Sequence, residues 1–257
     1  MGKITAIANQ KGGVGKTTTA VNISASLAAA GKSVLLIDTD PQGNLTSGLG
    51  FDKNNLNGSL YDLYTETSSL EKIIQGTGIE HLEIILSNIE LIGAELELAA
   101  REGRETILRQ ALEPAREKYN YIFIDCPPSL SLLTLNALVA ADSLLIPMQC
   151  EYYALEGISM LLRTYNLIKS SFNPSLEIEG ILITMFDGRN TLANQVTDEL
   201  KKHFGDKVYK TLIPRNVTLA EAPSHGKPAM LYDIHSKGAR SYLELAKEMM
   251  GNETRAW

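Results

Sequence analysis

The residues best suited to chemistry lie in a glycine-rich stretch near the N-terminus, residues 11–17, which reads KGGVGKT. It follows an apolar run at residues 4–8 and precedes a segment with helical periodicity. Glycine has no Cβ, so its backbone can wrap closely around an anion. Backbone N–H groups and the positive end of the following helix dipole would then face that anion. The order strand, loop, helix therefore predicts a phosphate-binding loop.

Two lysines and a threonine in this stretch suit different parts of a nucleotide. Lys16 would place its charge on the β- and γ-phosphates, and the Thr17 hydroxyl would hold Mg²⁺. The common pattern has glycine at position 10, but this chain has Gln10 there. Lys11 follows it and stands at the entrance of the loop. Lys11 is either a surface charge or reaches a phosphate held by another subunit. The residues expected to contact the nucleotide phosphates are Lys11, Gly12, Gly13, Val14, Gly15, Lys16, Thr17 and Thr18.

Aspartates close two other apolar runs. Asp38 and Asp40 follow residues 33–37, and Asp125 follows residues 121–124. Ligands of parallel sheets bind beyond the carboxyl ends of the strands, where such carboxylates can organise the water shell of Mg²⁺. A lone aspartate at a strand end is often only a cap or turn residue. Asp38 and Asp40 share one strand phase, so one could support the metal's waters and the other could orient an attacking water.

Apolar runs of strand length alternate with longer segments of helical periodicity. The strands expected are 4–8, 33–37, 82–86, 121–124, 143–148 and 178–185. The helices expected are about 16–30, 104–118, 132–140, 155–172 and 192–204. This order predicts an α/β fold with a doubly wound, mostly parallel sheet and helices on both faces, as in P-loop NTPases. Residues 50–80 are expected to be a surface excursion within a single domain of residues 1–257.

Composition limits the class of protein. The net charge is −6, and the acidic excess lies in residues 1–153, so any surface for a polyanion should be local and C-terminal. No apolar run is long enough for a membrane-spanning helix, and the first strand begins too early to leave room for a signal peptide. A cytoplasmic protein is expected. Cys126 and Cys150 end apolar runs and are interpreted as small core residues.

The glycine-rich stretch and its flanks resemble a known family. Residues 11–17 resemble the deviant Walker A motif of the ParA/MinD class of P-loop ATPases. The flanks at residues 8–10 (ANQ) and 18–22 (TTAVN) are similar to the ParA/Soj partitioning branch. The resemblance covers nearly the whole chain. It implies an ATPase in which Lys16 acts on its own nucleotide, while Lys11 contacts the ATP of the other subunit across a nucleotide-sandwich homodimer.

The same resemblance assigns further site residues. The string DTDPQGN at residues 38–44 resembles switch I, which implies that Asp40 positions the hydrolytic water and that Asp38 belongs to the surroundings of the metal. Asp125 begins a string that resembles switch II, which completes an expected metal set of Thr17, Asp38, Asp40 and Asp125. Residues 213–216 alone favour a turn. The resemblance instead implies that Pro214 packs against adenine and that the Asn216 amide hydrogen-bonds the edge of the base.

ParA-family proteins bind double-stranded DNA without sequence preference as ATP-bound dimers, and a ParB-type partner stimulates turnover. The resemblance therefore implies these partners and a nucleoid location. Arg189 matches a family arginine implicated in DNA contact. Thr218 stands where the family often has another arginine, so one expected contact with a DNA phosphate is missing. Either Lys237 and Arg240 compensate for it, or DNA binding is weaker. The basic residues considered, each of which could be a plain surface charge, are Arg189, Lys201, Lys202, Lys207, Lys210, Lys237 and Arg240.

Two other classes of P-loop ATPase need features that this sequence lacks. A MinD-like membrane protein needs a basic, amphipathic C-terminal helix. Residues 242–250 have an apolar stripe, but their polar face is as acidic as it is basic, which favours docking on the core and no membrane binding. An electron-transfer ATPase with an interfacial iron–sulfur cluster needs exposed cysteines at the dimer axis, whereas Cys126 and Cys150 lie in strand contexts.

Overall fold

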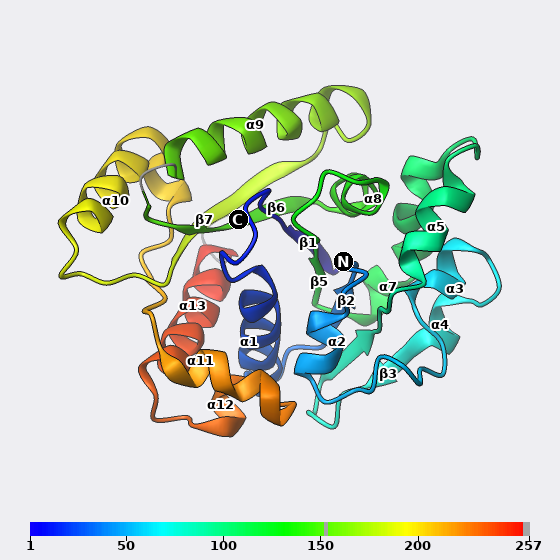
Figure 1. The fold of residues 1–257 in the computed structure, drawn as a ribbon, viewed down its shortest axis with the longest axis horizontal. Coiled ribbons are helices and arrows are strands. Elements are labelled where there is room, and N and C mark those ends of the chain that lie inside the picture. The colour runs from blue at the N-terminus through cyan, green and yellow to red at the C-terminus, as the bar shows by residue number, and fades with distance from the viewer. Residues whose placement is uncertain (152–153, 254–257) are drawn as a thin grey trace.

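The computed structural model describes residues 1–151 and 154–253, and a seven-stranded sheet lies at its centre (Figure 1). The strand order is β3-β4-β2-β5-β1-β6-β7. Every neighbouring pair is parallel except β3 with β4. The strands are β1 (Lys3–Ile7), β2 (Val34–Asp38), β3 (Ile74–Gly76), β4 (Leu82–Ile85), β5 (Tyr121–Asp125), β6 (Ser143–Gln149) and β7 (Glu177–Thr184).

Helices connect these strands and extend beyond the last one. The first part of the chain carries α1 (Lys16–Ala29), α2 (Asn44–Gly48), α3 (Leu60–Tyr64), α4 (Leu70–Ile73), α5 (Leu91–Leu98), α6 (Ile107–Leu112), α7 (Ala115–Lys118) and α8 (Leu132–Ala140). The second part carries α9 (Ala154–Ser171), α10 (Thr191–Phe204), α11 (Val217–Glu221), α12 (Ala229–Tyr232) and α13 (Lys237–Glu253).

Helices cover both faces of the sheet, as the strand pattern requires. Successive side chains of a strand point to opposite faces, so Ile4 and Ala6 belong to one core cluster and Ile7 to the other. The first cluster includes side chains of α8, α9 and α10, and the second those of α1 and α13. Figure 1 shows these two helix layers above and below the sheet. The doubly wound α/β prediction is confirmed.

Two expectations about local structure are wrong. The helix expected over residues 104–118 is broken into a 3-10 turn at Arg104–Thr106, α6 and α7, and Pro114 lies at the second break. Proline has no N–H to donate and cannot continue a helix from the preceding turn. Residues 50–80 are also more than a surface excursion. They supply α3, α4 and the edge strand β3, and Tyr64 and Ile73 are fully buried.

The C-terminal helix docks on the core, as expected. The Tyr242 hydroxyl of α13 lies 3.0 Å from the Thr19 hydroxyl of α1, and both groups are buried. Leu245 and Met249 continue the contact with the same core cluster. Cys126 and Cys150 are buried and carry free thiols, as predicted. Among the described residues, no helix is both long and apolar enough to cross a membrane. The expected single domain over 1–257 includes residues 152–153 and 254–257, which lie outside the described residues.

Candidate functional site

Strand register brings the glycine-rich loop and the aspartates together. Asp125 of β5 is the register partner of Ile7 in β1 on one side and of Asp38 in β2 on the other. The loop begins directly after Ile7. Three strand ends therefore form one row at the carboxyl edge of the sheet, which is where ligands of such sheets bind.

The loop has the backbone shape that its glycines predict. Gly13 and Gly15 have φ values of +71° and +86°, in the left-handed region that only glycine enters without strain. Gly15 is the N-cap of α1, and no side chain caps the helix and no acidic residue occupies its first turn. The first N–H groups of α1 are thus available for an anion, which the helix dipole also attracts.

Lys16 lies inside this loop. Its side chain is buried, and its Nζ is 3.3 Å from the carbonyl oxygen of Lys11. Burial lowers the pKa of the ammonium group, while the nearby charge of Asp125 acts in the opposite direction. A buried cation beside several oriented N–H groups is suited to a phosphate chain.

Asp125 is a buried carboxylate whose side-chain oxygens accept no hydrogen bond from the described residues. Burial, followed by the charge of Asp38, raises its pKa well above the usual range. The Thr17 hydroxyl, which is near the carboxylate without the geometry of a hydrogen bond, and the Lys16 ammonium act in the opposite direction. A buried carboxylate without a donor is stabilised by a cation, so Asp125 and Thr17 together fit Mg²⁺ or its water shell.

Asp38 differs from Asp125 because the protein itself uses its oxygens. Its Oδ2 accepts hydrogen bonds from the Thr46 N–H at 2.9 Å and the Thr46 hydroxyl at 2.8 Å, and its Oδ1 accepts one from the Asp40 N–H at 3.1 Å. Burial is the main cause that raises the pKa of Asp38 to about 6. Asp38 therefore holds the loop that carries Asp40 and fits the surroundings of a metal better than direct ligation.

Asp40 lies farther out, at the partly exposed end of this row. The Ser87 hydroxyl donates to the Asp40 carbonyl at 2.6 Å, and the Gln42 N–H donates to Asp40 Oδ1 at 2.9 Å. Asp40 is close enough to act electrostatically on both Lys16 and Asp125. The structure thus brings the four expected metal-site residues to one edge.

The described residues contain no group of three or more His, Cys, Asp or Glu side chains that could enclose a metal. Such an enclosure is not needed for Mg²⁺, which usually keeps several waters and takes one or two carboxylates plus substrate phosphates. The donor set of Thr17 and Asp125 beside a phosphate loop fits this type of cation.

Residues 213–216 run beside the exit of β7. Pro214 forms a parallel bridge with Phe186, and Asn216 is the N-cap of α11. The Asn216 Oδ1 is buried and has no hydrogen-bond partner among the described residues. This amide is consistent both with the turn and with the base-edge contact predicted from the sequence.

Lys11 points out of its own loop. Its ammonium forms an ion pair with Glu151, which follows β6, and the two side chains are about half exposed. The structure therefore separates the two lysines of the motif: Lys16 lies inside the loop and Lys11 outside it.

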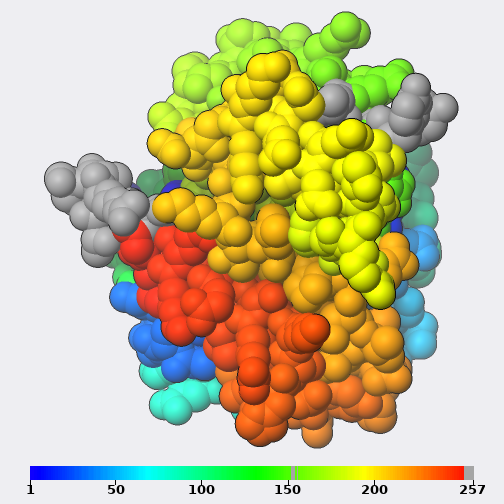
Figure 2. Space-filling view, turned by 90° about the vertical axis from the view of Figure 1, so that its left-hand side faces the viewer, coloured from blue at the N-terminus to red at the C-terminus, as the bar shows by residue number. Residues whose placement is uncertain are grey.

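The basic residues expected to contact DNA belong to the C-terminal half of the chain, and Arg189 lies in the loop that leaves the carboxyl end of β7. Arg189 is 92% exposed and forms an ion pair with Asp187. Lys237 and Arg240 are exposed in the first turn of α13. Figure 2 shows the face to which the segments from α10 to α13 contribute.

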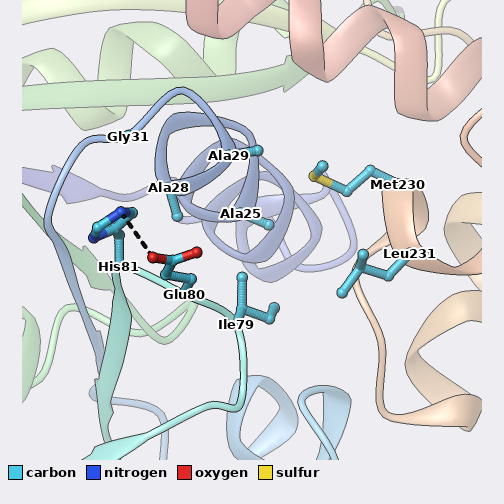
Figure 3. A pocket seen from close by; sticks show the side chains of 9 residues that line it. All are labelled: Ala25, Ala28, Ala29, Gly31, Ile79, Glu80, His81, Met230 and Leu231. Atoms are coloured by element: carbon cyan, nitrogen blue, oxygen red, sulfur yellow. Dashed lines mark ion pairs between the residues drawn. The ribbon is translucent and has the colours of Figure 1, made fainter.

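A separate pocket of about 250 Å³ lies at the other end of α1 (Figure 3). Ala25, Ala28 and Met230 line it together with Glu80 and His81, whose carboxylate and imidazole lie 3.6 Å apart. It lies near the C-terminal end of α1, whereas the glycine-rich loop precedes the N-terminal end. This pocket is therefore not part of the candidate site.

Sequence reasoning missed several polar residues that support the site. Each lies at or just beyond the carboxyl edge of the sheet, and each donates a hydrogen bond to the loop or to an aspartate. Three of them end a strand or closely follow one, which marks them as candidates in the sequence, whereas the fourth, Thr46, lies in α2 and carries no such signal. These residues are Thr46, Ser87, Gln149 and Thr184.

Comparison with known proteins decides the family. Residues 2–178 match a family described as an AAA domain. The sporulation initiation inhibitor protein Soj of Bacillus subtilis (strain 168) is 58% identical over 252 residues, which are 98% of this chain and 100% of that protein. The chain belongs to the ParA/Soj family. The chromosome partitioning protein ParA of Myxococcus xanthus (strain DK1622) is 52% identical over 99% of this chain and 90% of that protein.

A solved structure of this fold contains a nucleotide. The cobyrinic acid a,c-diamide synthase of Mycobacterium smegmatis with bound ATP analogue and magnesium is 35% identical, has a TM-score of 0.87, and covers 100% of this chain and 98% of that one. This ParA/Soj-family chain is an ATPase of the partitioning class. The family resemblance and the P-loop fold predicted from the sequence are confirmed.

Proposed function

We propose that Mg²⁺ and ATP close this chain into a sandwich homodimer that coats nucleoid DNA, and that hydrolysis releases it. The observation that carries the proposal is the different placement of two lysines. Lys16 is buried within the phosphate loop, whereas Lys11 points away from it. A lysine outside its own loop is free to reach the γ-phosphate of a partner once it leaves Glu151. The site is then complete only in the dimer.

Within one subunit, the chain's residues bind and orient the triphosphate. Lys16 and the first N–H groups of α1 hold the phosphates, and Thr17 and Asp125 hold Mg²⁺ and its waters. When bound, Mg²⁺ would neutralise the negative charge that develops on the phosphates. Asp40 orients the attacking water and accepts its proton, and Asp38 keeps the Asp40 loop in place through its hydrogen bonds. Pro214 and Asn216 contact adenine.

DNA binding is proposed for the basic residues of the C-terminal half. Lysine and arginine side chains that neutralise phosphates release counterions, so this binding should weaken steeply with salt. Arg189, Lys237 and Arg240 are exposed on elements that contribute to one face (Figure 2). We propose that Lys237 and Arg240 compensate for Thr218. The membrane alternative is disfavoured because the apolar stripe of α13 is buried against α1.

A ParB-type centromere-binding protein is the proposed partner that stimulates hydrolysis. The partitioning relatives support this role because the similarity spans almost the full length of both chains. The test is the rate of phosphate release from the chain with DNA, before and after such a protein encoded near it is added. A rate that stays unchanged would remove this partner.

The dimer and DNA steps are tested together in two measurements. Size-exclusion chromatography with light scattering should show a monomer without nucleotide and a dimer with Mg²⁺ and a non-hydrolysable ATP analogue. Random-sequence duplex DNA should then bind the dimer only, and the affinity should fall by orders of magnitude from 50 to 200 mM salt. A chain that remains monomeric when saturated with the analogue would contradict the proposal.

A further inference from the structure

The ends of β6 and β7 lie directly against the phosphate loop. Gln149 ends β6 and Thr184 ends β7, and the two are register partners. The Gln149 Nε2 donates to the carbonyl oxygen of Gly13 at 2.9 Å. The Thr184 hydroxyl donates to the carbonyl oxygen of Val14 at 2.8 Å. Two neighbouring strands thus hold two consecutive carbonyl groups of the loop.

The planarity of the peptide bond gives these contacts a consequence for the phosphate. In a trans peptide the C=O and N–H bonds point in opposite directions. The Gly13 carbonyl shares its peptide with the N–H of Val14, and the Val14 carbonyl shares its peptide with the N–H of Gly15. Holding both carbonyls on the side of β6 and β7 therefore turns these two N–H groups away from the strands and toward the interior of the loop.

Burial makes the Thr184 contact hard to replace. Thr184 is 2% exposed and Val14 is 1% exposed, so water has little access to the hydrogen bond between them. The same hydroxyl lies 3.2 Å from the Met148 carbonyl, but it has one proton and the shorter contact is to Val14. A Cβ on Gly15 would lie 3.7 Å from the Thr184 methyl group, so the side chain also packs against the loop.

The backbone after Thr184 is strained. Met185 has a φ of +51°, in the left-handed region that non-glycine residues rarely adopt. The Gln149 amide also contacts the Met185 sulfur. Strained residues persist where the surrounding structure holds them, and they cluster at functional sites. The bend at Met185 ends β7 next to the loop and leaves Thr184 facing it.

We infer that Thr184 and Gln149 are positioning residues of the phosphate loop: they fix the peptide planes of residues 13–15 so that the Val14 and Gly15 N–H groups face the nucleotide phosphates. The inference rests on the proposed nucleotide site and adds residues from two other strands to it. Both side chains donate to carbonyl groups of the loop backbone. Their effect is on the affinity for the phosphates.

The test compares two substitutions at one position. Thr184→Val keeps the shape but removes the proton donor, and Thr184→Ser keeps the donor but removes the methyl group. We expect Thr184→Val to weaken Mg-ADP binding in calorimetric titration about tenfold, and Thr184→Ser to stay within about twofold of the parent chain. Equal losses in the two variants, or no loss in Thr184→Val, would overturn the inference.

Controls separate positioning from folding and from the site itself. Thr197→Val removes another buried hydroxyl, which donates to Ala193 within α10, and should leave the nucleotide affinity unchanged. If Thr184→Val does not fold, Gln149→Met removes the other donor from a less buried position and should give the same loss of affinity. Lys16→Ala should abolish binding. If Lys16→Ala still binds Mg-ADP, the phosphate site is refuted. If Lys16→Ala loses binding while folded Thr184→Val and Gln149→Met bind as the parent chain does, only the positioning role is refuted.

Discussion

The ammonium group of Lys11 is ion-paired with the carboxylate of Glu151 in the same chain. In the proposed dimer the same ammonium contacts the partner's ATP, so it has to leave Glu151 first. The two side chains are about half exposed, and exposed ion pairs contribute only about 0.2–1 kcal/mol. Glu151 is therefore a weak competitor for Lys11, one that a phosphate with several negative charges can displace.

Removing this competitor should strengthen dimerisation. We expect Glu151→Gln to lower the dimer dissociation constant about two- to fivefold in the presence of a non-hydrolysable ATP analogue, because Lys11 no longer exchanges between two anions. Sedimentation equilibrium measures this constant. Glu156→Gln, which removes an exposed carboxylate on α9, is the matched control and should have no effect. A dimer of Glu151→Gln that is weaker than that of the parent chain would show that Glu151 assists Lys11.

Asp40 should be needed for turnover but not for binding. Its position at the outer end of the row suits it to orient a water, while Lys16 and Asp125 hold the phosphates and Mg²⁺. We expect Asp40→Ala to bind ATP with nearly unchanged affinity, to accumulate dimers, and to hydrolyse at least about a hundredfold more slowly. Single-turnover phosphate release and size-exclusion chromatography measure the two effects. Hydrolysis at the normal rate would exclude the assigned role.

The sequence predicted this site through residue types at strand ends, but it could not predict their neighbours. Asp38 and Asp125 were both expected near the metal. The structure distinguishes them because Thr46, from α2, donates twice to Asp38, while Asp125 receives no hydrogen bond from the described residues. Thr46 is only eight positions from Asp38 but belongs to another element, and no local pattern shows which group such a side chain contacts. Thr184 is a stronger example, since it lies 170 positions from the carbonyl that it holds.

The fold was predictable where a single apolar run determines the position of a strand. The parallel strands agree with the expected ranges within a residue or two, because runs covered on both faces leave one interpretation. The edge strand β3 was missed since it has three residues, all at least partly exposed, and gains its identity from pairing with β4. The single helix expected over residues 104–118 contains Pro114, and a proline inside a helical pattern already indicates a break in the sequence.

The buried carboxyl of Asp38 should make the ligand-free protein more stable relative to Asp38→Ala as the pH falls. Its pKa is about 6 in the folded chain, compared with 3.8 for an ordinary aspartate in the unfolded chain, so the folded state binds the proton first. The stabilising contribution is fully present below pH 3.8 and is lost as the pH rises through about 6, with a span of about 3 kcal/mol. Urea unfolding at pH 7 and pH 5 measures it. A difference between the two chains that does not change, or that changes in the other direction, would contradict the assigned ionisation.

Arg189 should act in DNA binding alone. Its side chain is 92% exposed, and among the described residues it forms an ion pair only with its neighbour Asp187, so replacing it should leave the core and the nucleotide site intact. We expect Arg189→Glu to weaken binding of the ATP-bound dimer to random duplex DNA about tenfold or more, and to make the salt dependence shallower because fewer counterions are released. Fluorescence anisotropy over a salt series measures both quantities. Lys72→Glu makes the same type of charge reversal on α4, on the other side of the molecule in Figure 1, and should change neither. If Arg189→Glu and Lys72→Glu weaken binding equally, net charge alone governs the affinity and Arg189 is not part of the DNA surface.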